Sequence, residues 1–205
     1  MKKLLLIISI LSFLSCSSEE DHSPENIMDM IFVENPERTV KVNIIYVESQ
    51  DSSDKSSYNL DEKEFINYLN GYYFHRLGIG LEIDESKKLI NDELYDLTDN
   101  QGSEPSTFFT QSQETYDKDK INIYIIKRSN IRGIAGMGRS QRVLLTDEHL
   151  FTSTSPHEIG HALGLFHTHE TGNIMSTEEK ALRQSFNKEQ EEKIKKRIDQ
   201  INLGS

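Results

Sequence analysis

The pattern of hydrophobic and polar residues predicts four strands along this 205-residue chain. Residues 39–48 carry apolar side chains on both faces of an extended segment, which is typical of a strand inside a sheet. Residues 121–126 and 143–145 are short apolar runs that predict two further strands, and another strand begins at residues 81–83. Residues 87–118 are polar and irregular, so we predict loops there, with at most one short helix near Phe108 and Phe109.

One helix is predicted between the first two strands. Asp61, with Glu64 three residues later, has the pattern of a helix start. Apolar residues then recur at helical spacing from Phe65 to Leu77, and Gly78 ends the pattern. A strand, a helix and a strand in this order predict a parallel pair of strands joined by a crossover.

A second helix is predicted near the end of the sequence. Asn187 and Gln190 resemble a helix start, and Ile194, Ile198 and Ile201 then form one apolar face. We expect this face to pack against the domain. The alternative is an amphipathic helix that binds a partner.

The stretch from His157 to His167 carries the chemistry of the chain, because it reads His-Glu-x-x-His-x-x-Gly-x-x-His. His157 and His161 lie one helical turn apart, so their imidazoles can bind one zinc ion. Glu158 is placed to take a proton from a metal-activated water. Gly164 can adopt the left-handed conformation that ends a helix, which lets His167 return as a third ligand. Three neutral ligands leave zinc an open position, as in catalytic sites.

This extended motif resembles the zinc signature of the metzincin clan of metalloendopeptidases. Residues 172–176, Gly-Asn-Ile-Met-Ser, resemble the clan's Met-turn, in which a methionine, here Met175, packs beneath the zinc-binding histidines. An ordinary core methionine is the alternative for Met175. The resemblance implies an α+β fold, in which a twisted mixed sheet with an antiparallel edge strand is joined by a backing helix, an active-site helix and a C-terminal helix.

The resemblance also assigns a role to the segment Gly133-Ile134-Ala135-Gly136, which continues to Gly138. In metzincins the strand at this place is the antiparallel edge of the sheet above the zinc cleft. An extended peptide can add to such an edge through main-chain hydrogen bonds, and glycines would let its backbone approach closely. A glycine-rich loop is the alternative.

Two alternatives concern the zinc motif itself. Ser155 and Glu158 have the spacing of a capping box, which would bend the carboxylate back onto the helix start; a helix that begins at Ser153 or Thr154 removes this conflict. His169 is a rival third ligand, although the spacing from the glycine fits His167.

The N-terminal region predicts export and a lipid anchor. A basic start and an apolar run from residue 4 to residue 14 are typical of a signal peptide, which we assign to residues 1–15. Cys16, the only cysteine, follows this run and resembles the lipidated residue of bacterial lipoproteins. We predict an outer-membrane lipoprotein on the cell surface; a secreted protein is the alternative. Residues 16–37 are predicted to be an acidic, polar tether, and residues 38–205 the catalytic domain.

Composition narrows the partners of the domain. A formal net charge of −11 argues against nucleic-acid binding. The zinc motif, the metzincin resemblance and the N-terminal signal together predict a monomeric zinc endopeptidase that cleaves extracellular proteins or peptides. The sequence leaves calcium open, although it contains no ligand-spaced loop of the EF-hand type. A narrow-specificity zinc peptidase and a non-proteolytic binding lipoprotein are the alternative functions.

Overall fold

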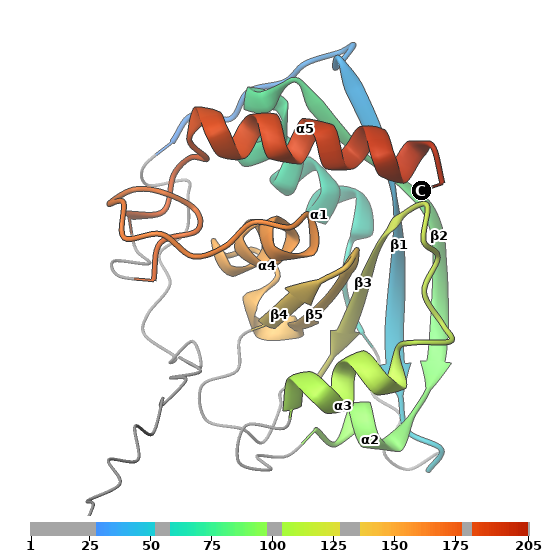
Figure 1. Ribbon diagram of the computed structural model, residues 1–205. Helices are drawn as coiled ribbons and strands as arrows, with labels where there is room; N and C mark the ends of the chain where they lie inside the picture. The colour runs from blue at the N-terminus through green and yellow to red at the C-terminus, as the bar shows by residue number, and fades with distance from the viewer. Residues whose placement is uncertain (1–27, 52–57, 98–103, 128–135, 178–181, 205) are drawn as a thin grey trace, which may run out of the picture.

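The computed structural model describes residues 28–51, 58–97, 104–127, 136–177 and 182–204. Five strands form one mixed sheet in the order β2-β1-β3-β5-β4 (Figure 1). The strands are β1 (Arg38–Glu48), β2 (Ile79–Ile90), β3 (Ile121–Ile126), β4 (Gly136–Arg139) and β5 (Arg142–Thr146). All neighbours pair in parallel except β4, which pairs antiparallel with β5 at one edge of the sheet. This arrangement confirms the predicted α+β fold and its antiparallel edge.

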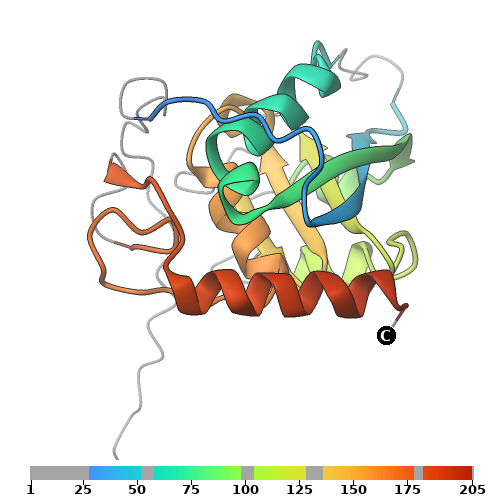
Figure 2. The same ribbon diagram turned by 90° about the horizontal axis from the view of Figure 1, so that it is seen from above.

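The helices lie on both faces of this sheet. They are α1 (Glu62–Leu69), α2 (Asp92–Tyr95), α3 (Glu104–Gln111), α4 (Thr154–Ala162) and α5 (Lys188–Asn202). In Figure 1, α5 runs across the top of the view, and α2 and α3 lie at its lower end. Figure 2, the view from above, shows the full length of α5 across the molecule.

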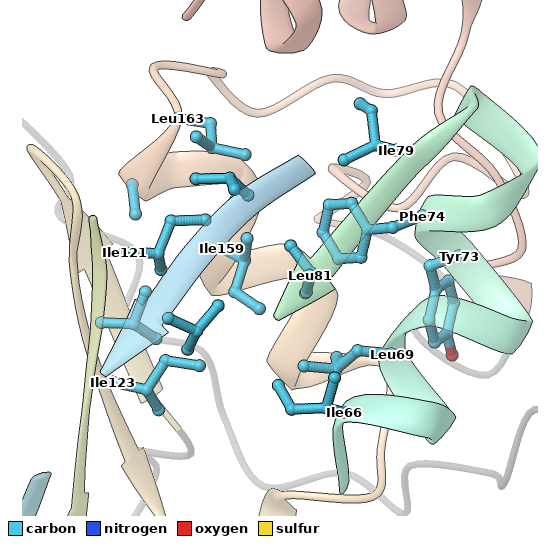
Figure 3. Packing of buried hydrophobic residues seen from close by; sticks show 14 of the residues in the cluster. Ile66, Leu69, Tyr73, Phe74, Ile79, Leu81, Ile121, Ile123, Ile159 and Leu163 are labelled. Carbon is cyan, nitrogen blue, oxygen red and sulfur yellow. The ribbon is translucent and has the colours of Figure 1, made fainter. Parts of the chain in front are cut away.

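Alternating side chains of the strands build two hydrophobic cores. On β3, Ile121, Ile123 and Ile125 face the larger core, whereas Tyr124 and Ile126 face the smaller one. The larger core fills the space between the sheet and the helices α1, α4 and α5 (Figure 3). The smaller core lies under α2 and α3. A strand that is buried on both faces explains why its sequence is continuously apolar.

Helix α1 begins as the sequence predicts, but it changes form before Gly78. The Asp61 carboxylate accepts a hydrogen bond from the Glu64 backbone N–H at 2.9 Å. Residues 70–74 then form a π-helical turn. The buried Asn70 amide pairs with the backbone N–H and C=O of Leu81 on β2 at 2.8 and 3.0 Å. The wider turn therefore places a polar side chain where it bonds to the sheet, a feature that apolar spacing does not reveal.

The prediction of loops across residues 87–118 is wrong in part. Strand β2 continues to Ile90 and helix α2 follows it, and neither was predicted, whereas α3 confirms the short helix near Phe108 and Phe109. The second half of β2 lies at the sheet edge and is mostly exposed, and residues 85–88 are polar and form ion pairs such as Lys88–Glu48 at 2.7 Å. An exposed, charged edge strand has no hydrophobic alternation to detect.

Residues 28–37, which the sequence assigns to the tether, lie against the domain where the structure describes them. The Ile31 N–H donates to the Gly71 carbonyl at 2.8 Å, and the Val33 N–H donates to Nδ1 of His75 at 3.1 Å. A Cβ atom on Gly71 would lie 2.4 Å from Cγ of Met30, so the absence of a side chain there permits this contact. The packed part of the domain therefore includes residues before position 38.

Candidate metal centre

Helix α4 carries two of the predicted zinc ligands on one face. It begins at Thr154 after Ser153, earlier than the Ser155–Glu158 capping box requires. The Ser155 hydroxyl instead donates to the Leu150 carbonyl at 2.7 Å. Glu158 consequently lies more than one turn inside the helix, away from the unpaired N–H groups that a cap would satisfy. The helix start resolves the conflict between capping and catalysis.

Gly164 ends helix α4 as the sequence predicts. Its φ angle is 91°, and no atom lies within 4 Å of the position that a Cβ would take. The Gly164 N–H donates to the His161 carbonyl and the Leu165 N–H to the Gly160 carbonyl, both at 2.9 Å. These two bonds define a Schellman motif, which turns the chain so that His167 comes back toward the helix.

The three predicted ligands converge. Nε2 of His167 lies 3.2 Å from Nε2 of His157 and 2.9 Å from Nε2 of His161. Four-coordinate zinc with Zn–N bonds of about 2.0–2.1 Å would hold its nitrogens roughly 3.3 Å apart. Among the residues that the structure describes, these histidines form the one group of three potential metal ligands. His169 lies outside that group, so His167 is the third ligand.

Backbone carbonyls orient two of the rings. Nδ1 of His157 lies 2.7 Å from the Ile174 carbonyl, and Nδ1 of His161 lies 2.9 Å from the Leu165 carbonyl. A carbonyl accepts only, so Nδ1 must carry the proton and Nε2 presents its lone pair. Lone pairs that face one another at these distances repel unless a cation lies between them. The donor set therefore fits zinc.

Burial keeps the histidines neutral. It lowers the pKa of His157 well below its ordinary value, lowers that of His161 to about 4, and lowers that of His167. The buried Arg183 guanidinium lowers all three pKa values further. A metal ligand must be deprotonated, so both effects favour metal binding.

Met175 occupies the place expected of a Met-turn residue. It is completely buried, and a Cβ on Gly160 of α4 would lie 2.5 Å from its Sδ. The methionine therefore packs against the backbone of the zinc helix. The preceding carbonyl, of Ile174, holds His157. This segment thus supports the ligands through contacts from both a side chain and the backbone.

Strand β4 lies directly against the zinc helix. A Cβ on Gly138 would lie 1.9 Å from the Glu158 carbonyl oxygen, and one on Gly136 would lie 2.8 Å from Cγ of Glu158. The two glycines are therefore required by close packing of strand and helix, which the glycine spacing alone does not reveal. Of the predicted substrate edge, Gly136 begins β4, whereas Gly133, Ile134 and Ala135 lie outside the described residues.

Two buried polar residues near the site were not found from the sequence. Arg183 donates through Nε and Nη2 to the Ser176 carbonyl at 3.0 and 2.6 Å. Asn173 lies within the Met-turn and is 3% exposed. A lone arginine in a polar segment gives no signal of its burial. Asn173, by contrast, stands beside Ile174 and Met175 in a recognised segment.

The fold and the histidine cluster together define a zinc-dependent metalloendopeptidase. Residues 22–200 match the Matrixin family of peptidases, known as peptidase M10. The chain belongs to that family. It therefore is a matrixin zinc metalloendopeptidase domain with a catalytic zinc site formed by His157, His161 and His167.

Solved structures show the same fold at low sequence identity. Metalloproteinase-II from Bacteroides fragilis is 17% identical, with a TM-score of 0.51 over 84% of this chain and 56% of that one. A chain from a chaperone–substrate complex is 14% identical, with a TM-score of 0.51 over 82% of this chain and 35% of that one. This chain thus spans only part of the length of those two. Archaemetzincin from Methanopyrus kandleri is 13% identical, with a TM-score of 0.49 over 78% of this chain and 96% of that one.

No curated protein matches the chain in sequence. Within the described residues, no helix is long and apolar enough to cross a lipid bilayer.

Proposed function

We propose that the domain cleaves peptide bonds of extracellular proteins or peptides with Glu158 as the general base. One observation carries this proposal. Glu158 adjoins the ligand His157 on α4, is only 4% exposed, and is held between the helix and strand β4. Because α4 begins at Thr154, the carboxylate is not needed as a helix cap. Its place next to a zinc ligand and beside the sheet edge supports a role in proton transfer.

The residues have separate roles in this mechanism. Zinc, when bound, supplies a Lewis acid that acidifies the attacking water and stabilises negative charge on the scissile carbonyl oxygen. Glu158 accepts a proton from that water and afterwards donates it to the nitrogen of the leaving amine. Strand β4 ends the sheet beside Glu158 and would align an extended peptide through main-chain hydrogen bonds.

Replacing Glu158 with glutamine tests the role of the base. Glutamine keeps the size of the side chain but cannot accept the proton, while the three histidines are unchanged. We expect Glu158→Gln to bind one zinc per chain as the wild type does, with kcat/KM on a cleavable peptide lowered at least ~10²-fold. Glu192→Gln, on the exposed part of α5, is the matched control and should keep full activity. Near-wild-type hydrolysis by zinc-loaded Glu158→Gln would refute the mechanism and favour another base.

We propose in addition that a lipid on Cys16 holds the enzyme, as a monomer, on the outer face of a bacterial outer membrane. The apolar run that ends at the chain's only cysteine supports this anchor, and the acidic residues after it support surface exposure. Cys16 lies outside the described residues. Substrates of such an enzyme would be proteins or peptides that reach the cell surface.

Metabolic labelling tests the anchor. A fatty-acid probe should label the wild type, and the protein should sediment with membranes. Cys16→Ala should abolish both, because no other cysteine can replace it. Recovery of an unlabelled wild-type protein in the culture medium would instead support the secreted alternative.

A further inference from the structure

The geometry points to Asn173 as a positioning residue that couples the first turn of α5 to the zinc ligands; we infer that its amide holds the Met-turn in the form that orients His157 and His167. The inference rests on the proposed zinc site, and it assigns a role to four polar residues outside the zinc motif: Asn173, Glu170, Asn187 and Gln190.

The Met-turn backbone holds two ligand segments at once. The Ile174 carbonyl accepts the bond from Nδ1 of His157 at 2.7 Å. The next carbonyl, of Met175, accepts a bond at 3.0 Å from the N–H of Thr168, which directly follows His167. These two carbonyls belong to consecutive peptide groups of the turn, so a change in the form of the turn would displace the segments of both ligands.

The Asn173 side chain fixes the first of these peptide groups, the one between Ile174 and Met175. Its Oδ1 accepts a hydrogen bond from the Met175 N–H at 2.8 Å. This N–H and the Ile174 carbonyl belong to the same peptide group, so the bond sets the direction in which the carbonyl points. Asn173 is 3% exposed, and water therefore has little access to replace this bond.

Helix α5 in turn fixes the Asn173 amide. Nδ2 of Asn173 donates to Oε1 of Gln190 at 2.9 Å and to Oε2 of Glu170 at 3.0 Å. Gln190 also closes the capping box of α5, accepting from the Asn187 N–H at 2.9 Å. The Asn187 side chain donates to the same Glu170 oxygen at 2.9 Å. Both oxygens are thus shared between the helix start and Asn173.

Every polar atom of the amide is therefore used, and the neighbours leave one orientation only. Two oxygens face Nδ2, and an N–H faces Oδ1, so a flipped amide would lose all three bonds. A rotation of α5 about its first turn would be transmitted through Gln190 and Asn173 to the carbonyl that holds His157. The path consists of hydrogen bonds between buried or half-buried groups.

Zinc affinity tests this role, because outer hydrogen bonds to metal ligands typically change affinity by about 10–100-fold. We expect Asn173→Ala to raise the zinc dissociation constant at least ~10-fold, measured by competition with a chromogenic chelator. The visible spectrum of the cobalt-substituted protein should also change, since the ligand rings are no longer held. Ile198→Ala is the matched control: it destabilises α5 by removing a buried side chain but leaves the amide network intact.

Two further variants make the test independent of folding yield. Gln190→Ala removes the oxygen that accepts from both Asn173 and the Asn187 N–H, and it should weaken zinc binding in the same direction. If Gln190 acts through Asn173, the double variant should bind zinc within about 2-fold of Asn173→Ala, rather than showing the product of the two effects.

The inference is overturned if the Asn173→Ala and Ile198→Ala proteins, both folded by circular dichroism, bind zinc equally well. It is also overturned if the effects of Asn173→Ala and Gln190→Ala multiply. A wild-type protein that binds no zinc would reject the zinc site itself, and this inference with it. If the wild type binds zinc and cleaves peptide normally, and Asn173→Ala and Gln190→Ala bind zinc as tightly as the wild type, the inference alone is rejected.

Discussion

At the scale of single residues, the zinc ligands owe their chemical form to backbone carbonyls and to burial. The Leu165 carbonyl accepts the hydrogen bond from Nδ1 of His161, and it lies within reach because Gly164 turns the chain. The Ile174 carbonyl that receives His157 comes from the Met-turn. Each carbonyl selects the tautomer whose Nε2 can bind a metal. The histidines alone would not define a zinc site without these two acceptors.

Burial of the ligands predicts how the metal-free protein responds to acid. The pKa of His161 falls from an ordinary 6.5 to about 4 in the folded state, and those of His157 and His167 are lowered too. Between pH 6.5 and about 4 the unfolded chain therefore binds more protons than the folded one. The free energy of unfolding should fall as the pH falls through this window.

Urea unfolding of chelator-treated protein at pH 7 and at pH 5 measures this effect. We expect a lower free energy of unfolding at pH 5, and a smaller difference for His161→Gln, which removes one of the titrating groups. The metal-free wild type could instead be equally or more stable at pH 5, and His161→Gln could show the same difference between the two pH values. That result would contradict burial of the histidines as the cause.

At the scale of elements, the contact between α4 and β4 places the base beside the sheet edge. Gly138 allows the strand to touch the helix backbone, whereas Gly164 serves only the turn that ends the helix. Alanine at these positions should therefore have different effects. At Gly164 it meets no atom and adds backbone strain of roughly 1–2 kcal/mol. At Gly138 it meets the Glu158 carbonyl and should cost about 3 kcal/mol or more.

Denaturant unfolding of the two zinc-free variants checks this order. Gly138→Ala should be the less stable of the two, and it should also lose activity when zinc is restored, because α4 must move. A Gly138→Ala protein more stable than Gly164→Ala would show that the strand does not press on the helix.

Elements with a strong hydrophobic pattern or a capping signature could be predicted from the sequence. Strand β3 has the predicted bounds, residues 121–126. The start of α1 at Asp61 and the capping box of Asn187 and Gln190 are also confirmed. The zinc ligands were found because their spacing reflects one helical turn and one glycine turn, both of which are local.

Elements that depend on distant contacts could not be predicted. The hairpin between β4 and β5 turns at Ser140 and Gln141, which both have positive φ angles without being glycine. Gln141 is held there by bonds to distant partners: its N–H donates to the Ala162 carbonyl at 3.0 Å, and its side chain donates to the Lys118 carbonyl at 2.8 Å. Arg183 and the π-helical turn at Asn70 depend on tertiary contacts in the same way.

At the scale of the whole molecule, the sheet separates two cores and brings distant segments to one site. Helix α5 packs three isoleucines into the core that also contains Ile159 of the zinc helix and Met175 of the Met-turn. This packing confirms that the C-terminal helix belongs to the domain. The metal centre is therefore assembled from α4, the segment after it, the Met-turn and the support of α5. Any loss of the fold should remove zinc binding and hydrolysis together.

Hydrolysis measured as a function of bound zinc tests the central claim most directly. The metal-free protein, prepared with a chelator, is mixed with increasing zinc while cleavage of a peptide library and zinc content are followed in the same sample. We expect no cleavage without metal and a plateau of activity at one zinc per chain. A His157→Ala control should reach neither that activity nor that zinc content. Cleavage that persists in the metal-free protein, or a fully zinc-loaded protein that cleaves no peptide in the library, would contradict the account.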